Sequence, residues 1–584
     1  MGLALLLIVL VVLLLSYRLY VSPKVRQNIS PLWERSTPAR RKMDSVDYFP
    51  TSSSVLTGFQ LRSISLDVII SPIIAVQFGW LPAILWLLIG AIFFGWVQDY
   101  LLTIISVRTS GKPFTKLFNQ YFNSKSRTLI YLFLIAYLLI IISQFSLLLS
   151  SLLSRVNIPF AIMIFVLVGF FAGFLIYRTR VSLIITSFLS IVIAIFGIWL
   201  SSSTQIMDAI DQINHFLIEL GMVGSSGSIF GEITWQSLLS LLVIFFVCYL
   251  GATLPAWRFA VPFNYISNWM VIIGFSIALI GFSLGTLTGS INANFELPPV
   301  VTTYQPQIGP LWPIRFVTLS SGAISGWHSL VSSFTTSHQV EKEPLVKPIT
   351  TGALYGETFT VAIIIIFAAT FGVSSGIFDQ EQNYALVSGP ASVFATGFAK
   401  TWNVIGISPT IGASISTILL TLMGLSVLHL VVRYARVIQS DLLGRRLPAF
   451  NNPHLSTITV LIVSLLLVMI GVREWLWILF AGANQLLAAL VLMFATIWLT
   501  GQKKAILWTF IPSVFLFLTG LTAIFYSSVY QPFLKEIVTS ASIYDLITIR
   551  SITSLAFAIF FSTIAAYIYI IGLNKLIGAR MKNS

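Results

Sequence analysis

The sequence has few charged residues and only one cysteine, and both shortages limit what the protein can be. Only 9% of the 584 residues are charged, whereas a soluble globular protein carries roughly a quarter. Hydrophobic residues make up 57% of the chain. Cys248, the single cysteine, has no partner for an internal disulfide. This composition predicts an integral membrane protein without covalent cross-links.

Motifs for catalysis and for ATP hydrolysis are also missing from the sequence. It has no His-Glu-x-x-His, no Cys-x-x-Cys and no phosphate-binding Gly-Lys-Ser/Thr motif. The string Gly224-Ser-Ser-Gly227 resembles the nucleophile motif of rhomboid proteases, but it lies in a polar loop without a plausible base. No repeated filter-like loop or acidic ring indicates an ion channel. We therefore expect no enzyme activity, no cofactor and no metal ion other than sodium.

Long apolar runs follow one another along the chain with short breaks between them. A helix that crosses a bilayer needs about 20 apolar residues, and a run such as Leu129 to Leu153 meets that length. A β-barrel would instead show alternating segments of about 10 residues. The first run, Gly2 to Val21, lacks a basic residue before it and a cleavage site after it, so it is expected to be a retained helix. The fold class is thus an all-α integral membrane protein.

The charges are distributed unevenly between the two sides of the membrane. The net charge is +14, and alternating loops place most basic residues on one side. Short basic loops mark the cytoplasmic side, so we expect the plasma membrane with the N-terminus outside and the C-terminus cytoplasmic. The excess charge then reflects topology and attraction to the lipid bilayer, and no nucleic acid is expected as a partner. The basic segments are Lys24 to Lys42, Arg108 to Arg127, Arg433 to Arg446 and Lys503/Lys504.

The order of the apolar runs predicts two consecutive five-helix units of opposite orientation. Each unit is expected to begin with an interrupted helix, at Ser63 to Pro72 and at Gly251 to Trp257, because Pro and Gly free backbone groups there. This arrangement is a LeuT-like 5+5 inverted repeat with about five extra transmembrane helices. The predicted segments are an N-terminal helix and basic loop (1–55), the first repeat (56–201), an external loop (202–235), the inverted second repeat (236–440), and four additional helices with a cytoplasmic tail (441–584).

Six stretches, in order along the chain, resemble the carbon starvation protein A family of peptide and pyruvate transporters, within the amino acid, polyamine and organocation superfamily. The resemblance implies a LeuT-like core and cation-coupled uptake of small peptides or small carboxylates such as pyruvate. The stretches are Ser36-Thr-Pro-Ala with Asp47-Tyr-Phe-Pro-Thr51, Phe94-Gly-Trp-Val-Gln-Asp99, Gly309-Pro-Leu-Trp-Pro313, Ser321 to Ser333, Arg433 to Gly444, and Asn484-Gln-Leu-Leu-Ala-Ala489.

The chain departs from that family at two positions. Its first interrupted helix reads Gly58 to Pro72, without the family's histidine and its Gly-Ala-Gly-Pro-like segment. His429 stands where an acidic residue is expected, one turn before the Arg-x-x-Arg helix end. Both departures fall where the substrate or the coupling ion is expected to bind.

Charged residues inside the predicted spans are few. Arg18, Arg315 and Glu357 lie near helix ends, where snorkelling of the side chain to the interface explains them. Asp99 lies beside Gln98 and near Arg108, and it is either part of a structural ion pair or cap, or a functional group. The six residues are Arg18, Arg62, Asp67, Asp99, Arg315 and Glu357.

Asp67 is the exception, because it lies near the middle of the membrane. A carboxylate there costs about 2.5 to 3.5 kcal/mol, so something must compensate for it. Either Arg62 pairs with it, or it binds a cation or a proton and cycles between charged and neutral forms, or it faces lipid. The hydroxyls of Ser65 and Ser71 lie nearby, and Pro72 interrupts the helical hydrogen bonds. Oxygen-rich unwound backbone suits a hard cation or an anionic substrate.

The stretch from Ser320 to Ser333 has small polar residues at three- and four-residue spacing. On a helix this spacing places Ser325, His328 and Ser329 on one face. The face is either a close-packed helix interface or part of a cation site facing the first interrupted helix. His328 is either a substrate contact or proton relay, or a packing residue. His429, next to bulky Leu and Val, is either a structural residue or a secondary candidate for the site.

These residues predict a secondary transporter that works by alternating access. The coupling ion is a proton or sodium, and the substrate is a small peptide or a small carboxylate. The alternative is a passive channel or facilitator in which Asp67 only neutralises Arg62. The expected substrate-binding residues are Ser65, Thr253, Trp257, Trp327 and His328. The expected coupling residues are Asp67, Ser71, Ser325, Ser329, Ser332 and Ser333, with Gln98, Asp99 and His429 as secondary candidates.

Overall fold

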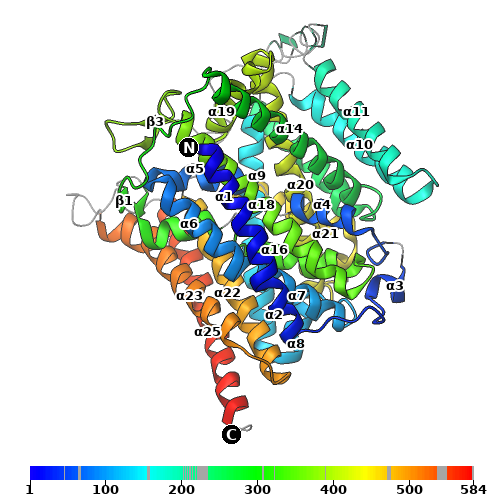
Figure 1. Ribbon diagram of the computed structural model, residues 1–584. Coiled ribbons are helices and arrows are strands. Elements are labelled where there is room, and N and C mark those ends of the chain that lie inside the picture. The colour runs from blue at the N-terminus through cyan, green and yellow to red at the C-terminus, as the bar shows by residue number, and fades with distance from the viewer. Residues whose placement is uncertain are drawn as a thin grey trace.

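The computed structural model is built almost wholly of helices (Figure 1). It describes residues 1–44, 46–63, 67–153, 158–201, 235–305, 308–320, 323–387, 390–469, 475–535 and 549–581, with single positions between 203 and 219. Within this part, 11 helices are long and apolar enough to cross a membrane, or up to 12 if a bent pair counts as one span. The prediction of an all-α multi-pass membrane protein is confirmed.

The N-terminal span packs along the outside of the helix bundle. It consists of α1 (Gly2–Ser16), a π-helical segment at Tyr17–Val21 and α2 (Ser22–Asn28). α1 contacts α18 (Val346–Phe371), and the hydroxyl groups of Ser16 and Tyr355 lie 2.7 Å apart. The short helix α3 (Pro38–Lys42) follows in the basic loop.

The first broken helix follows this loop. It consists of α4 (Ser53–Ser63) and α5 (Asp67–Ala75), which continues as a 3-10 turn through Phe78. The axes of the two halves differ by 49°, and Pro72 lies inside α5. The predicted interruption of this helix is therefore confirmed by the bend between its two described halves.

The next helices are α6 (Trp80–Gly90), α7 (Trp96–Arg108), α8 (Phe114–Tyr121), α9 (Ser124–Leu153), α10 (Ile158–Arg178), α11 (Leu183–Ser201), α13 (Trp235–Thr253) and α14 (Ala260–Thr288). The interruption predicted at Gly251 to Trp257 is wrong. α13 continues through Gly251 and ends at Thr253, and the following residues connect it to α14. Gly251 has another role: a Cβ atom there would lie 2.6 Å from the Cβ of His429, so glycine lets α13 approach α20 (Pro409–Leu443) closely.

The second broken helix lies at residues 311–339 instead. Its first half is the π-helical segment Leu311–Arg315 with α15 (Phe316–Ser320), and its second half is α16 (Gly326–Val331), Ser332–Thr336 and α17 (Ser337–Gln339). Ser325 has extended backbone, with φ −90° and ψ 128°, and precedes α16. The predicted continuous helix from Ser320 to Ser333 is therefore wrong at Ser325, and the helical part that carries His328, Ser329 and Ser332 begins at Gly326.

The remaining helices, after α18, are α19 (Pro390–Val404), α20, α21 (Pro453–Met469), α22 (Trp475–Gly501), α23 (Leu507–Phe525) and α25 (Ile549–Met581). Two small antiparallel sheets lie in the loops. They pair β1 (Tyr304–Gln305) with β2 (Gly309–Pro310), and β3 (Phe378–Asp379) with β4 (Ala385–Leu386).

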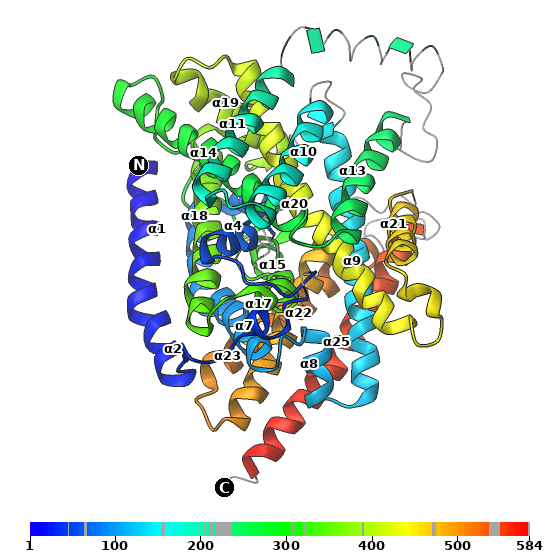
Figure 2. The same ribbon diagram turned by 90° about the vertical axis from the view of Figure 1, so that its right-hand side faces the viewer.

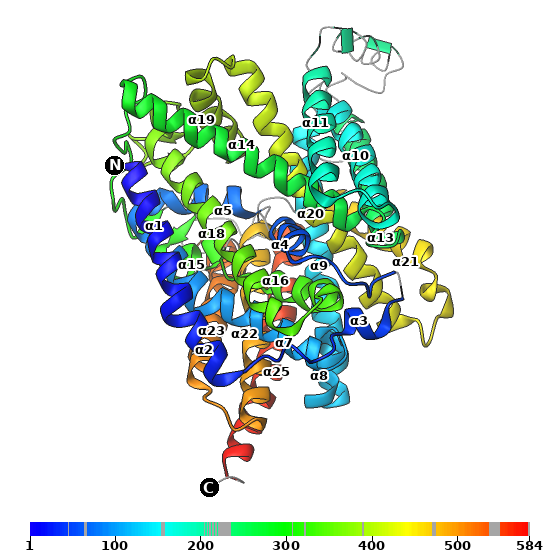
Figure 3. The ribbon, with the colours of Figure 1, turned by 45° about the vertical axis from the view of Figure 1, so that its right-hand side comes forward.

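The helices form a dense centre with lipid-accessible flanks. The most apolar windows of α20 and α22 are each 94% buried inside the protein, whereas those of α10 and α11 are 39% and 33% buried. α10 and α11 lie side by side along one flank, and α23 and α25 lie along another (Figures 1 and 3). The two termini lie at opposite ends of the molecule (Figure 2). α20 and α22 therefore form the scaffold on which both broken helices rest.

An ion pair ties the loop before α4 to α20. Arg433 donates from Nη2 to the Asp47 carboxylate over 2.7 Å, and its Nη1 donates to the carbonyl groups of Gly251 and Leu254. Burial acts to raise the pKa of Asp47, but the charge and hydrogen bond of Arg433 outweigh it, so this pKa lies below its ordinary value. A carboxyl group whose pKa is lowered by folding stabilises the protein above its unfolded pKa, and this stabilisation is lost as the pH falls through the folded pKa.

We expect Asp47→Asn to destabilise the protein at pH 7 by less than about 1 kcal/mol, because the pair is partly exposed. The difference from the native protein should begin to shrink as the pH falls through the ordinary Asp pKa of about 3.9, so that it is smaller at pH 3 than at pH 7, and it should vanish only below the lowered pKa of the folded state. Thermal unfolding of both proteins in detergent at the two pH values measures this. A difference that is equal at pH 7 and pH 3 would contradict the assignment.

Candidate functional site

Two carboxylates and a histidine meet in the centre of the protein. His328 on α16 has its Nδ1 atom 3.5 Å from Oδ2 of Asp99 on α7, and its Nε2 atom 3.5 Å from Oε1 of Glu357 on α18. All three side chains have 0% exposure. The second broken helix is thus joined to α7 and α18 through one histidine that stands between two acids.

Arg62 belongs to the same cluster. It is 1% exposed, lies one residue before the end of α4, and is acted on by the charge of Glu357. The expectation that Glu357 snorkels is wrong, because α18 holds it against other helices. Arg315 does not snorkel either: it is 1% exposed and donates from Nη2 to the Gly79 carbonyl over 3.1 Å.

Asp99 does not pair with Arg108. Arg108 donates from Nε to Glu343 over 2.6 Å, near the end of α7, and Asp99 faces His328 instead. Both alternatives for Asp99, a structural ion pair or cap and a functional group, therefore stay predictions, with His328 and not Arg108 as its neighbour. The cluster of Asp99, His328, Glu357 and Arg62, called the acid–histidine cluster below, is the largest group of buried ionisable side chains near the two breaks among the described residues.

α7 packs directly against the second break. The Gln98 amide donates to the Ser325 carbonyl over 2.7 Å. One turn earlier, a Cβ atom at Gly95 would lie only 1.9 Å from the Ala323 carbonyl oxygen. Only glycine allows this approach of the two backbones. Asp99 is thereby held opposite the first turn of α16.

Asn484 on α22 holds the second break from the other side. Its Nδ2 donates to Ser325 Oγ over 2.9 Å, and its Oδ1 accepts from Tyr137 on α9 over 2.6 Å and from the Trp327 backbone N–H over 3.2 Å. Both Asn484 and Tyr137 are buried. We call this group, Asn484 with Ser325 and Tyr137, the Asn484 clasp.

Asn264 on α14 holds the first break in a similar way. Its Nδ2 donates to Ser63 Oγ and to the Ser426 carbonyl on α20, both over 3.0 Å. Its Oδ1 accepts from Nε2 of His429 on α20, also over 3.0 Å. An amide oxygen only accepts, so His429 carries its proton on Nε2. We call this group, Asn264 with Ser63 and His429, the Asn264 clasp.

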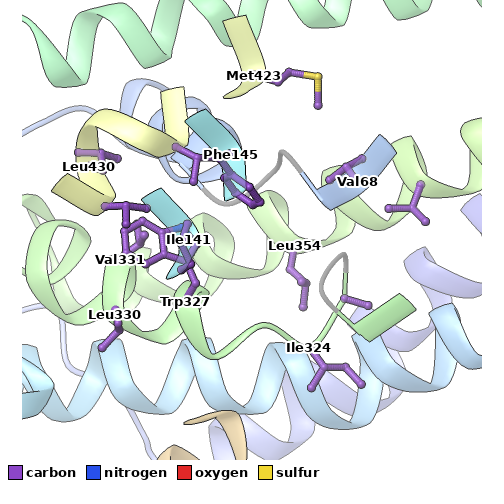
Figure 4. Packing of buried hydrophobic residues seen from close by; sticks show 14 of the residues in the cluster. Val68, Ile141, Phe145, Ile324, Trp327, Leu330, Val331, Leu354, Met423 and Leu430 are labelled. Atoms are coloured by element: carbon purple, nitrogen blue, oxygen red, sulfur yellow. The ribbon is translucent and has the colours of Figure 1, made fainter. Parts of the chain in front are cut away.

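Trp327 connects the two clasps. Its backbone N–H donates to Asn484, and its indole Nε1 donates to the Ser63 carbonyl over 2.7 Å. The ring is 4% exposed and stands among apolar side chains from several helices, including Ile141 and Leu430 (Figure 4). One side chain therefore bridges both broken helices, directly beside His328.

The other serines predicted in this region separate into two kinds. Ser332 accepts a hydrogen bond from the Gln60 amide over 3.1 Å, and Ser333 accepts one from the Phe114 N–H over 3.3 Å, so both join neighbouring helices. Ser71 and Ser329 have 0% exposure, and their hydroxyls make no hydrogen bond to the described residues. A buried hydroxyl is normally satisfied, so these two mark positions where a ligand or water can bind.

Two predicted substrate residues lie elsewhere. The Thr253 hydroxyl donates to the Tyr249 carbonyl of its own helix over 2.7 Å. Trp257 packs under the Arg178 guanidinium, 4.6 Å from the ring centre, and lines a hollow of about 490 Å³ with Phe170 and Phe174. These contacts place Thr253 against its own helix and Trp257 beside the end of α10.

Ser65 and the side chain of Asp67 lie outside the described residues, so their predicted roles stay predictions. The sequence did not predict that Arg62 and Glu357 interact, and it did not indicate Asn264 or Tyr137 as part of the site. Asn264 and Tyr137 were detectable only as single polar residues within apolar runs. Among the described residues, no group of three or more His, Cys, Asp or Glu side chains could hold a metal ion.

The broken helices, the buried acid–histidine cluster and the scaffold helices define a multi-pass membrane protein with a polar centre between two interrupted spans. A sequence model described as carbon starvation protein CstA matches residues 1–381 and 377–523. The chain belongs to this family, and the predicted family resemblance is confirmed.

Curated relatives are similar over different lengths. The pyruvate/proton symporter BtsT of Escherichia coli is 26% identical over 392 residues, which cover 65% of this chain and 49% of BtsT. The peptide transporter CstA of Bacillus subtilis is 28% identical and is covered to 60%. The peptide transporter CstA of Escherichia coli is 24% identical over 589 residues, covering 87% of this chain and 78% of that protein. The chain thus spans about half of BtsT and three fifths of the Bacillus relative.

Solved structures of transporters are similar at low identity. A mutant of the manganese transporter of Eremococcus coleocola is 12% identical, with a TM-score of 0.44 and coverage of 91% of this chain and 99% of that one. MhsT in complex with L-phenylalanine is also 12% identical, with a TM-score of 0.43 and coverage of 90% and 98%.

Proposed function

We propose that this chain is a proton-coupled secondary transporter, which takes up small carboxylates or small peptides by alternating access. The observation that carries the proposal is His328 held between Asp99 and Glu357 in the fully buried centre, with the buried Arg62 interacting electrostatically with Glu357. Buried ionisable groups inside a membrane are costly, and they are retained mainly where they bind ions, protons or charged substrates.

The charge of the acid–histidine cluster favours the binding of one proton. With neutral His328, its two carboxylates and one guanidinium leave one net negative charge. A single proton neutralises the cluster, whether it resides on His328 or on either acid. Because an uncompensated charge is expensive away from water, the loaded and unloaded cluster should favour different conformations of the helices around it.

The position of the acid–histidine cluster supports coupling to a substrate. Arg62 lies one residue before the end of α4, and His328 lies in the first turn of α16, so the cluster has members on both broken helices. The unpaired hydroxyls of Ser71 and Ser329 lie on the same two broken helices. A carboxylate substrate that enters with a proton brings no net charge into the centre. The names of the relatives, pyruvate/proton symporter and peptide transporter, agree with this substrate class.

The distribution of basic residues supports the predicted orientation. Lys24, Lys503 and Lys504 line a hollow of about 670 Å³ together with Trp508, although they come from distant parts of the chain. Short basic segments of this kind indicate the cytoplasmic face. We therefore orient α4 with its first residue toward the cytoplasm, the N-terminus outside and the C-terminus inside the cell.

Uptake into proteoliposomes tests the proposal. An inward proton gradient in sodium-free buffer should drive labelled pyruvate or a labelled dipeptide to accumulate several-fold above equilibrium. A protonophore should abolish the accumulation. Accumulation that needs a sodium gradient would overturn proton coupling, and equilibration without accumulation would favour a passive facilitator.

A further inference from the structure

A hollow of about 670 Å³ lies between the N-terminal span and the turn that joins α22 to α23. Lys24 on α2 lines it from one side, and residues between positions 500 and 508 line it from the other. The hollow is at the end of the molecule that carries the C-terminus, where α2 lies beside α23 (Figures 2 and 3). Its volume falls in the range of small-ligand sites, about 300 to 1,000 Å³.

Three lysines give this hollow a positive charge. They are Lys24, Lys503 and Lys504, and none of them forms an ion pair with a carboxylate of the described residues. No acidic side chain in the same part of the chain lines the hollow. Because like charges that share one hollow repel each other, a bound anion relieves their repulsion. The hollow therefore favours an anionic ligand.

The N-terminus of α23 opens on the same hollow. The helix begins at Leu507, and Ile506 before it makes no side-chain hydrogen bond to the helix end. The first N–H groups of an α-helix have no partner within the helix, and together with the helix dipole they bind phosphate oxygens. The uncapped helix end and the three lysines are independent features, and both suit a phosphate group.

An apolar stripe continues from the hollow along the outer face of α23. Leu507, Ile511 and Leu518 are each more than half exposed, and their spacing of four and seven residues places them on one face of the helix. The stripe is about 16 Å long at 1.5 Å per residue, close to the half-thickness of the bilayer hydrocarbon, about 15 Å. A soluble phosphate leaves this stripe uncovered, whereas an acyl chain of a phospholipid covers it.

Aromatic rings close the inner side of the hollow. Trp508 is buried, its indole donates to the Ala505 carbonyl over 2.8 Å, and its ring stacks on Trp96 of α7 with 6.2 Å between ring centres. Tyr20 of the N-terminal span packs edge-on against Trp96, and its ring lies 5.9 Å from the Lys24 amine. Tryptophan and tyrosine are enriched at the depth of the lipid headgroups. The rings therefore indicate that the hollow lies at that depth.

We propose that the hollow binds the headgroup of an anionic phospholipid. The phosphate lies between the three lysines and the N-terminus of α23, and an acyl chain follows the apolar stripe. Basic pockets between membrane helices bind headgroups of this kind. The lipid bridges α2 and the α22–α23 turn, and it thereby holds an N-terminal span whose most apolar window is only 22% buried by the protein. The proposal is independent of the transported substrate and of the coupling ion.

Lipid titration of the purified protein in detergent tests the charge and the chemical class of the ligand. Native mass spectrometry should show that phosphatidylglycerol binds at least about tenfold more tightly than phosphatidylcholine, which has no net charge. Phosphatidylglycerol should also raise the temperature of thermal unfolding by several degrees. Equal binding of the two lipids would overturn the proposal. An equal rise with glycerol 3-phosphate would assign the hollow to a soluble phosphate and overturn the lipid.

A triple variant tests the three lysines. Lys24→Gln/Lys503→Gln/Lys504→Gln should weaken phosphatidylglycerol binding by at least about tenfold, because each lysine near a membrane surface adds to the attraction of anionic lipid. A matched variant removes three exposed basic residues that do not line the hollow and should bind the lipid as the native protein does. An equal loss in both variants, or no loss in the first, would overturn the site. The matched variant is Arg41→Gln/Lys125→Gln/Arg446→Gln.

Photolabelling of the native protein locates the lipid without relying on the folding of a variant. Phosphatidylglycerol with a photoreactive group in the acyl chain, next to the headgroup, should label residues 500–511 and α2. Digestion and mass spectrometry identify the labelled peptides. Labelling spread evenly over the lipid-exposed helices, or concentrated on α10 and α11, would contradict the proposed site.

Discussion

Replacing His328 by alanine is expected to abolish proton-driven accumulation while substrate still equilibrates across the membrane. His328 is the group between Asp99 and Glu357, 3.5 Å from each. Without His328, Asp99 and Glu357 have no titratable group between them. A proton that binds to either acid then no longer acts on the second broken helix, which carries His328. The rate of driven uptake in proteoliposomes should fall to less than about a tenth of the native rate.

A second histidine provides the matched control for this variant. His215 is exposed and lies between α11 and α13 in the sequence, so His215→Ala should accumulate substrate as the native protein does. Monodisperse elution of both variants in detergent checks that they fold. Native accumulation by the His328→Ala protein would remove the acid–histidine cluster from the coupling mechanism.

The Arg108→Met variant is expected to show the largest loss of stability, about 3 kcal/mol. Glu343 is fully buried and accepts hydrogen bonds from Arg108, from Arg35 over 3.1 Å and from the Leu32 N–H over 3.2 Å. Removal of Arg108 leaves a buried carboxylate with one half-exposed cation. Thermal unfolding in detergent, in the native protein and the variant, measures the loss.

An exposed ion pair nearby provides the comparison. Arg40 pairs with Glu341 where both side chains are exposed, at 46% and 38%. Such pairs contribute less than about 1 kcal/mol, so Arg40→Met should unfold close to the native temperature. Equal destabilisation by both substitutions would mean that the burial of Glu343 is not what makes its pair important.

Much of the fold could be predicted from the sequence, because hydrocarbon thickness sets the length of each span. The first break was also predictable, since Pro72 and Asp67 interrupt an apolar run. The second break was not predictable. The polar residues from Ser320 to Ser333 have the spacing of a helix, and only the packing of Ala323 on Gly95 shows that the helix is interrupted there. Gly251 was misread because a close helix crossing and a helix break use the same residue type.

The candidate site was predictable only residue by residue. His328 and Asp99 were both singled out, but their contact joins positions more than 200 residues apart, and no local pattern indicates it. Glu357 seemed to lie near a membrane surface because span ends were placed from hydropathy alone. The bundle buries it instead, where its charge acts on the buried Arg62. Pairings of this kind depend on tertiary packing, which a single sequence does not reveal.

The close approach at Gly95 couples the movement of α7 to the movement of the second break. With no side chain between the two backbones and with Gln98 bound to Ser325, neither can slide without the other. The distance between α7 and α16 should therefore stay constant throughout the proposed transport cycle. A pair of spin labels on these two helices would serve as an internal ruler, against which the movement of every other helix can be measured.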